Sequence, residues 1–365
     1  MTIWSQSPED YFIIEHLINY LRRKKKITTI IYQNKNFDIK YDKKLNCNSH
    51  KIFSSKINFL NKIYFIYYLI YLIFYIFFKK PHILIIFNNY PLLIIQIIKY
   101  FYKGKLIYHN FDYEPFEKNI FKKLLNHFEK KNINLFNEVI FSNEKRGAKF
   151  NKYLKKKINI KTVYNCLPLN YLPSIKYKKK KIVRIFRIGT IGPGHGLINL
   201  IKSFKYLPVN YHLTLCGIVL NKNFYSDLKS IIRSSNIERR VKINVSASKK
   251  QWIKKMIDSD VGVAFYEPVN TSHKFMTGAS QKINSYLAAG LPVLLSNEQQ
   301  FKLFTKKYKC SVNVNITKPK DIAYKIKSTL SNKEKIKKLK NNSLAAFKNN
   351  FNFDNQIKKI SLFYD

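Results

Sequence analysis

Residues that build disulfide frameworks and zinc sites are scarce in this sequence. Its 365 residues include only four cysteines, which lie far apart and form no CxxC pair and no Cys/His cluster. This spacing is typical of free thiols in a reducing compartment, and it excludes the usual zinc motifs. The N-terminus has neither a basic start nor a cleavage site, so we expect no signal peptide.

Acidic residues are also scarce, because 21 Asp and Glu stand against 67 Lys and Arg and the formal net charge is +46. Such an excess is typical of proteins that bind nucleic acid or an anionic membrane. Only eight of the basic residues are Arg, the side chain that reads bases and clamps phosphates. Lys, Asn, Ile, Tyr and Phe share adenine- and thymine-rich codons, so genome composition is an alternative source of the lysine excess. We expect no nucleic-acid partner, and we expect an anionic membrane surface as a partner.

Hydrophobic residues make up 46% of the chain, enough for two domains with their own cores. Short apolar runs alternate with helical patterns, which predicts an α/β fold with parallel sheets. We place one domain at residues 1–166, a linker at 167–181, a second domain at 182–345, and a C-terminal helix at 346–365 that crosses back to the first domain. The expected strands are 2–4, 28–32, 83–87, 105–108 and 138–142, then 183–188, 212–216, 241–245, 261–265, 292–295 and 311–314.

One uncharged run, Ile63 to Phe78, is dominated by Ile, Tyr, Phe and Leu. It is shorter than the roughly twenty apolar residues that a membrane-spanning helix needs. Its tyrosines and the flanking Lys62, Lys79 and Lys80 suit a membrane interface. Three interpretations stay open: a helix of the domain core, a helix that contacts a membrane surface, and a true span.

A glycine-rich loop, Arg187-Ile-Gly-Thr-Ile-Gly-Pro-Gly-His-Gly196, leaves an expected strand and enters an expected helix. Glycines let backbone N–H groups approach an anion, and a helix N-terminus adds positive charge, so a diphosphate is the expected ligand. The loop lacks the GxGxxG spacing and the later acidic residue of a dinucleotide site, and it lacks the Gly-Lys-Ser/Thr of a P-loop. A tight turn without a ligand is the alternative.

A second polar cluster follows another expected strand. The segment 262–268 leaves that strand with Glu267 in its loop, a candidate catalytic carboxylate or contact of the donor sugar, with a solvated carboxylate as the alternative. The segment 280–294 contains a short helix that Gly290 ends. Ligands of open α/β sheets lie beyond the carboxyl ends of the strands, so we expect Lys282 to lie at that edge with other polar groups of its helix. These are Ser280, Asn284 and Ser285.

Together the two segments resemble the C-terminal domain of GT-B glycosyltransferases of the family 4 (group 1) type. "GTIGPGHG" resembles the phosphate loop of that family, and "SQKINSYLAAGLPVL" resembles its donor-binding helix and the following strand. The resemblance covers residues 184–314, and extends loosely upstream to "KLIYHNFDYEP" and "VIFSNEKRGAKF". It implies two Rossmann-like domains facing a central cleft, with the sugar nucleotide in the C-terminal domain and the acceptor in the N-terminal domain. It also implies no bound metal, no other cofactor, and retention at the anomeric carbon.

The resemblance assigns roles by position. It implies that Lys282 neutralises the charge of the leaving group. His195 stands where the family often has Lys or Arg, and Thr190 replaces a common phosphate-binding Arg. Ser285 and Thr277 replace the two glutamates of the family motif, of which the one at Ser285 binds the ribose. The residues implied to face the diphosphate are Gly192, Gly194 and Gly196.

In the N-terminal domain, Asp112 and His109 follow an expected strand, where the family often has a His-Asp pair, and they are candidate catalytic residues. Gln6 and Ser7 follow the first strand and are expected to border the acceptor site, although Ser7 is equally suited to cap a helix. A loop histidine without chemistry is the alternative for His109. The DxD pattern at 258–260 lies at the end of a helix, away from the expected cleft, so we expect a turn role for it rather than metal binding.

These observations predict a glycosyltransferase that moves a sugar from a nucleotide donor to a lipid-linked or other membrane-proximal glycan in surface polysaccharide synthesis. We expect it in the cytoplasm, at the inner face of the plasma membrane. The alternatives are a basic nucleic-acid-binding protein and a catalytically degenerate GT-B scaffold.

Overall fold

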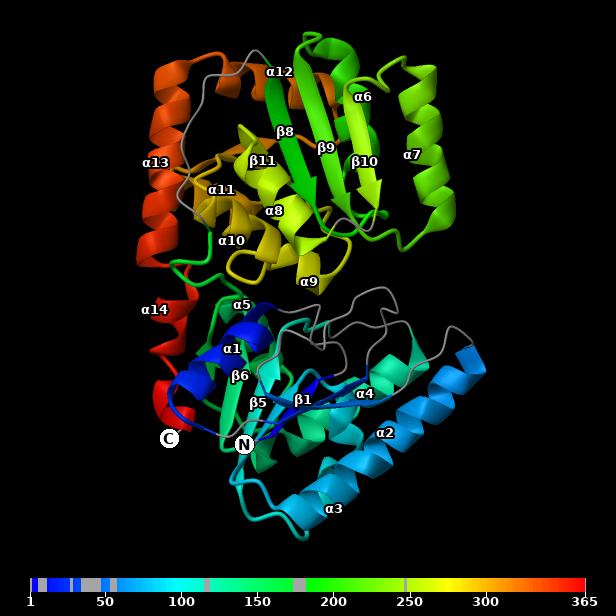
Figure 1. The fold of residues 1–365 in the computed structure, drawn as a ribbon, viewed down its shortest axis with the longest axis vertical. Coiled ribbons are helices and arrows are strands. Elements are labelled where there is room, and N and C mark those ends of the chain that lie inside the picture. The colour runs from blue at the N-terminus through cyan, green and yellow to red at the C-terminus, as the bar shows by residue number, and fades with distance from the viewer. Residues whose placement is uncertain are drawn as a thin grey trace. The chain divides into compact units, whose positions relative to one another are not determined.

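The computed structural model describes residues 2–5, 12–26, 29–33, 47–52, 58–114, 119–172, 182–245 and 248–364. The chain forms two units, of which the first contains residues 1–166 and 353–365 and the second contains residues 167–352. Each unit is built on its own parallel sheet with helices packed against it (Figure 1). The predicted α/β class with two Rossmann-like domains is confirmed.

The sheet of the first unit has the strand order β3-β2-β1-β4-β5-β6-β7. Its central strands are apolar runs such as Ile83–Phe87, in which all five residues are buried, as a sheet covered on both faces requires. The order reverses between β1 and β4, so the carboxyl ends of these strands form the switch point of the sheet. The strands are β1 (Thr2–Ser5), β2 (Thr29–Gln33), β3 (Asn48–Ile52), β4 (Ile83–Phe87), β5 (Lys105–Asn110), β6 (Glu138–Phe141) and β7 (Ile160–Thr162).

Two hydrophobic clusters lie on opposite faces of this sheet, because successive residues of a strand point to opposite sides. Ile107 packs with α1 and the C-terminal segment, whereas Tyr108 packs with α2 and α3. The C-terminal segment is held to the unit through Gln356, whose side-chain oxygen accepts from the N–H of Tyr164 at 3.0 Å. The helices are α1 (Phe12–Arg23), α2 (Asn58–Lys79), η2 (Tyr90–Ile94), α3 (Ile95–Ile98), α4 (Ile120–Asn132), η3 (Ile133–Leu135), α5 (Glu144–Lys152), α14 (Phe353–Ile357) and η5 (Ser361–Tyr364).

The sheet of the second unit has the order β10-β9-β8-β11-β12-β13, and it reverses between β8 and β11, which pair directly. The hydroxyl of Tyr286 joins these two strands, because it accepts from the N–H of Ile188 at 3.0 Å and donates to the carbonyl of Val263 at 3.2 Å. Gly262 leaves room for this ring, since a Cβ there would lie 2.5 Å from it. The strands are β8 (Val183–Ile188), β9 (Tyr211–Gly217), β10 (Val241–Val245), β11 (Val261–Ala264), β12 (Val293–Ser296) and β13 (Ser311–Val314).

The helices of the second unit cover both faces of its sheet. Two of them adjoin the predicted site: α6 follows the glycine loop, and α10 contains Lys282. The helices are α6 (Leu197–Lys202), η4 (Ser203–Tyr206), α7 (Lys222–Ser234), α8 (Lys249–Ile257), α9 (Thr271–Lys274), α10 (Gln281–Ala288), α11 (Gln299–Tyr308), α12 (Pro319–Leu330) and α13 (Lys333–Asn349).

The predicted helix at 346–365 is divided between the two units. Residues 346–349 end α13 in the second unit, and 353–365 form α14 and η5 in the first. Asn352 ends α13, because its side-chain amide donates to the carbonyls of Phe347 and Lys348. A side chain that satisfies the last carbonyls of a helix stops that helix, and the chain then continues into the other unit.

Candidate functional site

The predicted site segments meet at the switch point of the second sheet. The glycine loop follows β8, and the loop with Glu267 follows β11, which is the neighbour of β8. Open α/β sheets bind their ligands at such a point, outside the carboxyl ends of the two strands. The pairing of these strands was not visible in the sequence, and it brings two distant segments of the chain together.

The glycine loop lies directly against Lys282. Gly189 has a φ of 113°, and a Cβ on it would lie 3.2 Å from Cδ and 3.5 Å from Nζ of Lys282. Gly194 has a φ of 84°, and its added Cβ would lie 3.2 Å from Cε1 of His273. Both positions need glycine for conformation as well as space. Gly192 needs it for neither, because its φ is not positive and the nearest atom to an added Cβ is 3.7 Å away.

Arg187, the last buried residue of β8, is the second cation at this point. Its side chain is 2% exposed, Nη1 donates to the carbonyl of Gly189 at 2.5 Å, and Nη2 has no hydrogen-bond partner. Burial lowers the pKa of Arg187 from 12.5 to about 10. No motif in the sequence points to Arg187, although a charged residue within a strand of a two-sided parallel sheet is itself an unusual signal.

Lys282 is half-buried in the first turn of α10, and its Nζ lies 4.5 Å from the ring centroid of Tyr266. Burial, with a smaller effect of the Arg187 guanidinium, holds the pKa of Lys282 well below its usual value. Across the described part of the chain, neither cation forms an ion pair with a carboxylate. A buried cation, Arg187, and a half-buried one, Lys282, lie side by side without a counter-charge, which destabilises the folded protein, and an anionic ligand is the natural compensation.

His195 does not supply the positive charge that its family position implies. It is buried, its Nδ1 has no partner, and its ring centroid lies 5.1 Å from that of His273. Burial, then the positive charges of Lys282 and Arg187, lower the pKa of His195 to about 2. The imidazole is therefore neutral near pH 7, and it offers hydrogen bonds rather than charge.

Glu267 holds the loop together instead of facing outward. Its carboxylate accepts from the N–H of Gly196 at 3.0 Å, and its own N–H donates to the carbonyl of Gly194 at 3.0 Å. Gly196 is the residue that precedes α6, so Glu267 occupies a backbone donor at the N-terminus of that helix. The backbone amide of Gly196 was expected to contact the diphosphate, but this prediction does not fit, because the amide already donates to the carboxylate of Glu267.

The other polar residues predicted for the site on α10, Ser280, Asn284 and Ser285, are buried. Ser280 caps the helix through the N–H of Ile283, and its hydroxyl lies 2.6 Å from that of Tyr266. Asn284 is fully buried and donates to the carbonyl of Gly278 at 2.8 Å, and Ser285 is 2% exposed. Ser280 and Asn284 therefore make these contacts within the unit, and Ser285 is as buried as Arg187. Of the predicted set on α10, Lys282 is the residue that lies against the glycine loop.

Thr190 is half-buried in the glycine loop, next to the buried bridge that Ile191 makes with Val219. The DxD pattern lies at the other end of the sheet: Asp260 accepts from the N–H of Arg184 at 2.8 Å, where β8 and β11 begin. This agrees with the turn role predicted for it. Within the described residues, no group of His, Cys, Asp and Glu is arranged to hold a metal ion.

In the first unit the structure separates the two predicted catalytic residues. Asp112 follows β5, is largely exposed, and has its carboxylate 3.8 Å from Nη1 of the buried Arg146. His109 is buried on the opposite face to Tyr108, and its Nε2 lies 3.0 Å from the hydroxyl of Tyr364. Burial lowers the pKa of His109 to about 3. This geometry makes His109 an anchor for the C-terminal segment and leaves only Asp112 accessible. Gln6 and Ser7 lie outside the described residues.

Solved structures with the same fold extend over the whole chain. HepE from Anabaena, solved with UDP and glucose, matches with a TM-score of 0.78 at 14% identity over 99% of this chain and 98% of that one. Sucrose-phosphate synthase from Thermosynechococcus elongatus matches with a TM-score of 0.76 at 12% identity, over 100% and 97%. WaaG, a glycosyltransferase involved in lipopolysaccharide biosynthesis, matches with a TM-score of 0.70 at 12% identity, over 99% and 98%.

The chain has the GT-B fold. No protein-family model matches the sequence, and no curated protein sequence matches it. At this level of identity the GT-B likeness rests on the arrangement of strands and helices rather than on shared residues. The resemblance inferred from the two sequence segments is confirmed at the level of the fold.

Proposed function

We propose that this GT-B protein is a glycosyltransferase that moves a sugar from a nucleoside-diphosphate donor. The observation that carries the proposal is that Arg187, whose Nη2 has no hydrogen-bond partner, and Lys282 both lie against Gly189 of the glycine loop at the switch point of the second sheet. A diphosphate is the anion that fits a glycine loop beside two fixed positive charges. The structure of HepE contains UDP and glucose, which supports UDP as the first nucleotide to test.

In the proposed reaction the protein positions the donor and stabilises the negative charge of the leaving diphosphate. The bond between the anomeric carbon and the donor diphosphate breaks while the acceptor hydroxyl oxygen bonds to that carbon and loses its proton. The diphosphate leaves with the electron pair, and one of its oxygens takes up the proton of the acceptor hydroxyl. Arg187 and Lys282 are already fixed beside the glycine loop, so they stabilise this charge as it develops without reorganising. On the family resemblance we propose retention at the anomeric carbon and no requirement for a bound metal.

For the acceptor we propose a lipid-linked or other membrane-proximal glycan in surface polysaccharide synthesis, at the cytoplasmic face of the plasma membrane. A polyprenyl-diphosphate glycan is anionic and held at a membrane, and the net charge of +46 favours such a partner. WaaG, which shares the fold, is described as acting in lipopolysaccharide biosynthesis. Asp112 is the accessible carboxylate at the end of β5 and is the residue we propose for contact with the acceptor or the transferred sugar.

Calorimetry with UDP tests the donor site directly. Lys282→Ala removes one charge-assisted interaction with the diphosphate, so we expect an affinity about 10- to 100-fold lower than that of the wild type. Lys306→Ala, at an exposed lysine of α11, is the matched control and should bind UDP normally. Transfer is then measured with nucleotide sugars and a membrane lipid extract. Unchanged UDP affinity and transfer in Lys282→Ala would refute the site.

A degenerate GT-B scaffold is the second candidate. One observation favours it: Ser285, at the position of the ribose-binding glutamate, is 2% exposed and is not a carboxylate. A scaffold binds no nucleoside diphosphate, so the same calorimetry across the common nucleotides separates the two candidates. A nucleic-acid-binding protein would instead retain RNA or DNA on a filter, with an affinity that falls steeply with salt.

A further inference from the structure

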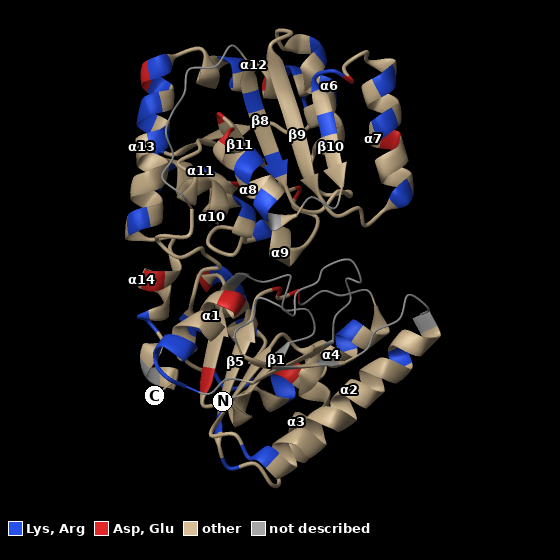
Figure 2. Ribbon diagram, in the orientation of Figure 1, with Lys and Arg blue, Asp and Glu red and all other residues tan. Residues whose placement is uncertain are grey.

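Helix α2 of the first unit presents an apolar surface outward. A helix on the surface of a soluble domain normally has polar residues on its outer face. Here nine large apolar side chains follow the outer face over five turns, and Figure 2 shows the helix without acidic residues and with basic residues near its ends. A stretch of this kind marks an interaction site. The nine exposed residues are Phe59, Leu60, Ile63, Ile66, Tyr67, Ile70, Phe74, Phe77 and Phe78.

The inner face of the same helix fixes its position. Tyr68, Leu72 and Ile76 recur at intervals of four residues, are fully buried, and pack in the cluster that covers the sheet. The helix connects β3 to β4, and both strands belong to one sheet through β2 and β1. By length and composition α2 is apolar enough to cross a membrane, with 17% of its apolar window buried. A crossing would place β3 and β4 on opposite sides of the bilayer and break this sheet, so the span interpretation does not fit.

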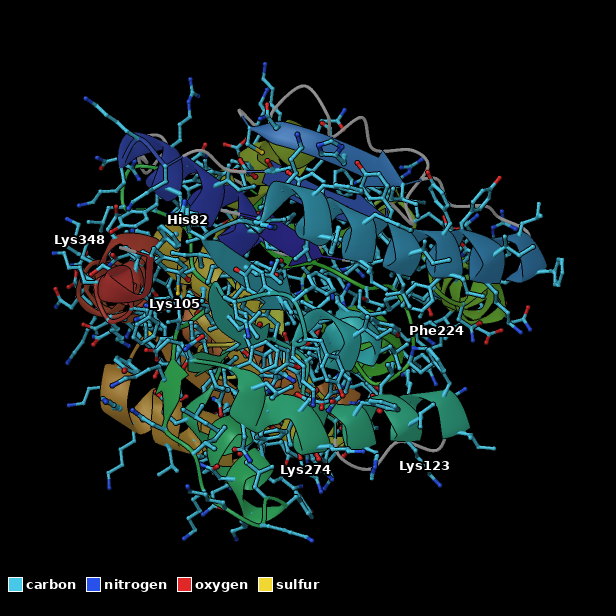
Figure 3. All side chains as sticks on the ribbon, turned by 90° about the horizontal axis from the view of Figure 1, so that it is seen from below. His82, Lys105, Lys123, Phe224, Lys274 and Lys348 are labelled. Atoms are coloured by element: carbon cyan, nitrogen blue, oxygen red, sulfur yellow. The ribbon has the colours of Figure 1, made fainter. Side chains whose placement is uncertain are left out.

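The apolar surface continues onto neighbouring elements. Phe121, in the first turn of α4, contacts Phe65 and Tyr90 through its ring and is itself exposed. Tyr100, just after α3, is 78% exposed. Figure 3 views this side of the unit from below and shows α2 near the viewer, with Lys123 of α4 directed outward. We call the exposed faces of α2, the end of α3 and the start of α4 the apolar face.

The charges of α2 and of the chain on either side of it are of one sign. Residues 43–111 contain neither Asp nor Glu, and Lys62, Lys79 and Lys80 flank the apolar run of α2. Two copies of the chain that paired through α2 about a two-fold axis would bring these lysines together without a carboxylate between them. Anionic lipid headgroups instead provide the opposite charge, and Tyr, Phe and Lys are the residues that settle at the boundary between headgroups and acyl chains.

We propose that the apolar face docks on an anionic lipid bilayer, with α2 lying in the plane of the interface. The exposed face of α2 runs about 30 Å from Phe59 to Phe78, long enough to contact many headgroups along its length. Its phenyl and isoleucine side chains enter the acyl boundary, and its terminal lysines pair with lipid phosphates. The apolar face contains no residue of the donor site, so membrane docking and sugar transfer are tested independently.

Flotation of the full chain with vesicles tests the proposal. We expect binding to vesicles of equal parts phosphatidylcholine and phosphatidylglycerol, and weaker binding to phosphatidylcholine alone. Ile70→Glu/Phe74→Glu should lower the partition at least tenfold, or about 1.4 kcal/mol. Lys79→Glu/Lys80→Glu should remove the preference for the anionic vesicles. The matched control is Val209→Glu/Leu220→Glu, at two exposed apolar residues of the second unit, which should bind vesicles as the wild type does.

Two results would overturn the proposal. The first is equal vesicle binding by the wild type and Ile70→Glu/Phe74→Glu, or no binding by either. The second is a wild-type dimer in light scattering that this variant converts to a monomer, since a second copy of the chain would then cover the face. UDP affinity is measured in parallel and should be the same in every variant, which shows that the chain is folded and keeps this test apart from that of the donor site.

Discussion

Arg187→Met is expected to stabilise the free protein while it weakens nucleotide binding. The pKa of Arg187 falls from 12.5 to about 10 because burial disfavours its charged form. A shift of this size corresponds to about 3 kcal/mol against folding. The folded pKa lies below the unfolded one, so this cost is complete at pH 7. It disappears only as the pH rises from about 10 through 12.5.

Methionine has a similar length and no charge, so it removes this cost. It also removes the hydrogen bond from Nη1 to the carbonyl of Gly189, which is worth about 1 kcal/mol. The net gain expected is about 1–2 kcal/mol, or roughly 2–6 °C in melting temperature for a unit of this size. Arg184→Met is the matched control, because Arg184 lies on the same strand and is only half-buried; we expect a change within about 0.5 kcal/mol.

Chemical denaturation without ligand and calorimetry with UDP are the two measurements. The expected pattern is opposite signs: higher stability and about 10-fold or greater loss of UDP affinity. A variant that is less stable than the wild type and binds UDP equally well would refute the reasoning, because Arg187 would then be a structural residue. A protein that keeps a destabilising buried charge keeps it for its function.

Three further predictions concern the first unit and the glycine loop. Burial raises the pKa of Glu129 from 4.5 to about 7, so the first unit should lose stability as the pH rises from about 4.5 to 7. The Glu129→Gln variant should lack this pH dependence and should be about 2 kcal/mol more stable than the wild type at pH 8. Equal stability of the wild type at pH 5 and pH 8 would contradict this prediction. Tyr364→Phe removes the hydrogen bond to His109, so chemical denaturation should show a free energy of unfolding about 1–2 kcal/mol lower, with sugar transfer unchanged. A variant with wild-type stability but no transfer would instead support a catalytic role for His109. Gly217→Ala would place a Cβ 1.8 Å from the carbonyl oxygen of Gly189, so this variant should lose thermal stability and UDP affinity. Gly192→Ala should keep the wild-type melting temperature and UDP affinity, because the nearest atom to its added Cβ is 3.7 Å away. Similar behaviour of the two glycine variants would argue against the loop geometry.

The glycine loop and Lys282 were found from the sequence because each has a local signature. Glycines before a helix and a polar turn after an apolar strand reflect backbone geometry and sheet edges, and these depend on neighbouring residues. Asn284 and Ser285 follow Lys282 by two and three positions, and their surroundings depend on packing that the sequence does not contain. A helix turns by about 100° per residue, so Asn284 faces away from Lys282. In the described part of α10, Lys282 lies against Gly189 of the glycine loop.

The alternation of apolar strands and helices in the sequence determined the α/β class and the two sheets. Strands and helices repeat their apolar residues with different spacings, and these spacings can be recognised in the sequence itself. The tertiary structure decided which strands are neighbours. That decision places Arg187 beside Lys282, closes Glu267 onto Gly196, and buries His109 against Tyr364, 255 positions further along the chain. Burial and charge compensation depend on every atom nearby, most of them distant in sequence, so no local pattern of residues contains them.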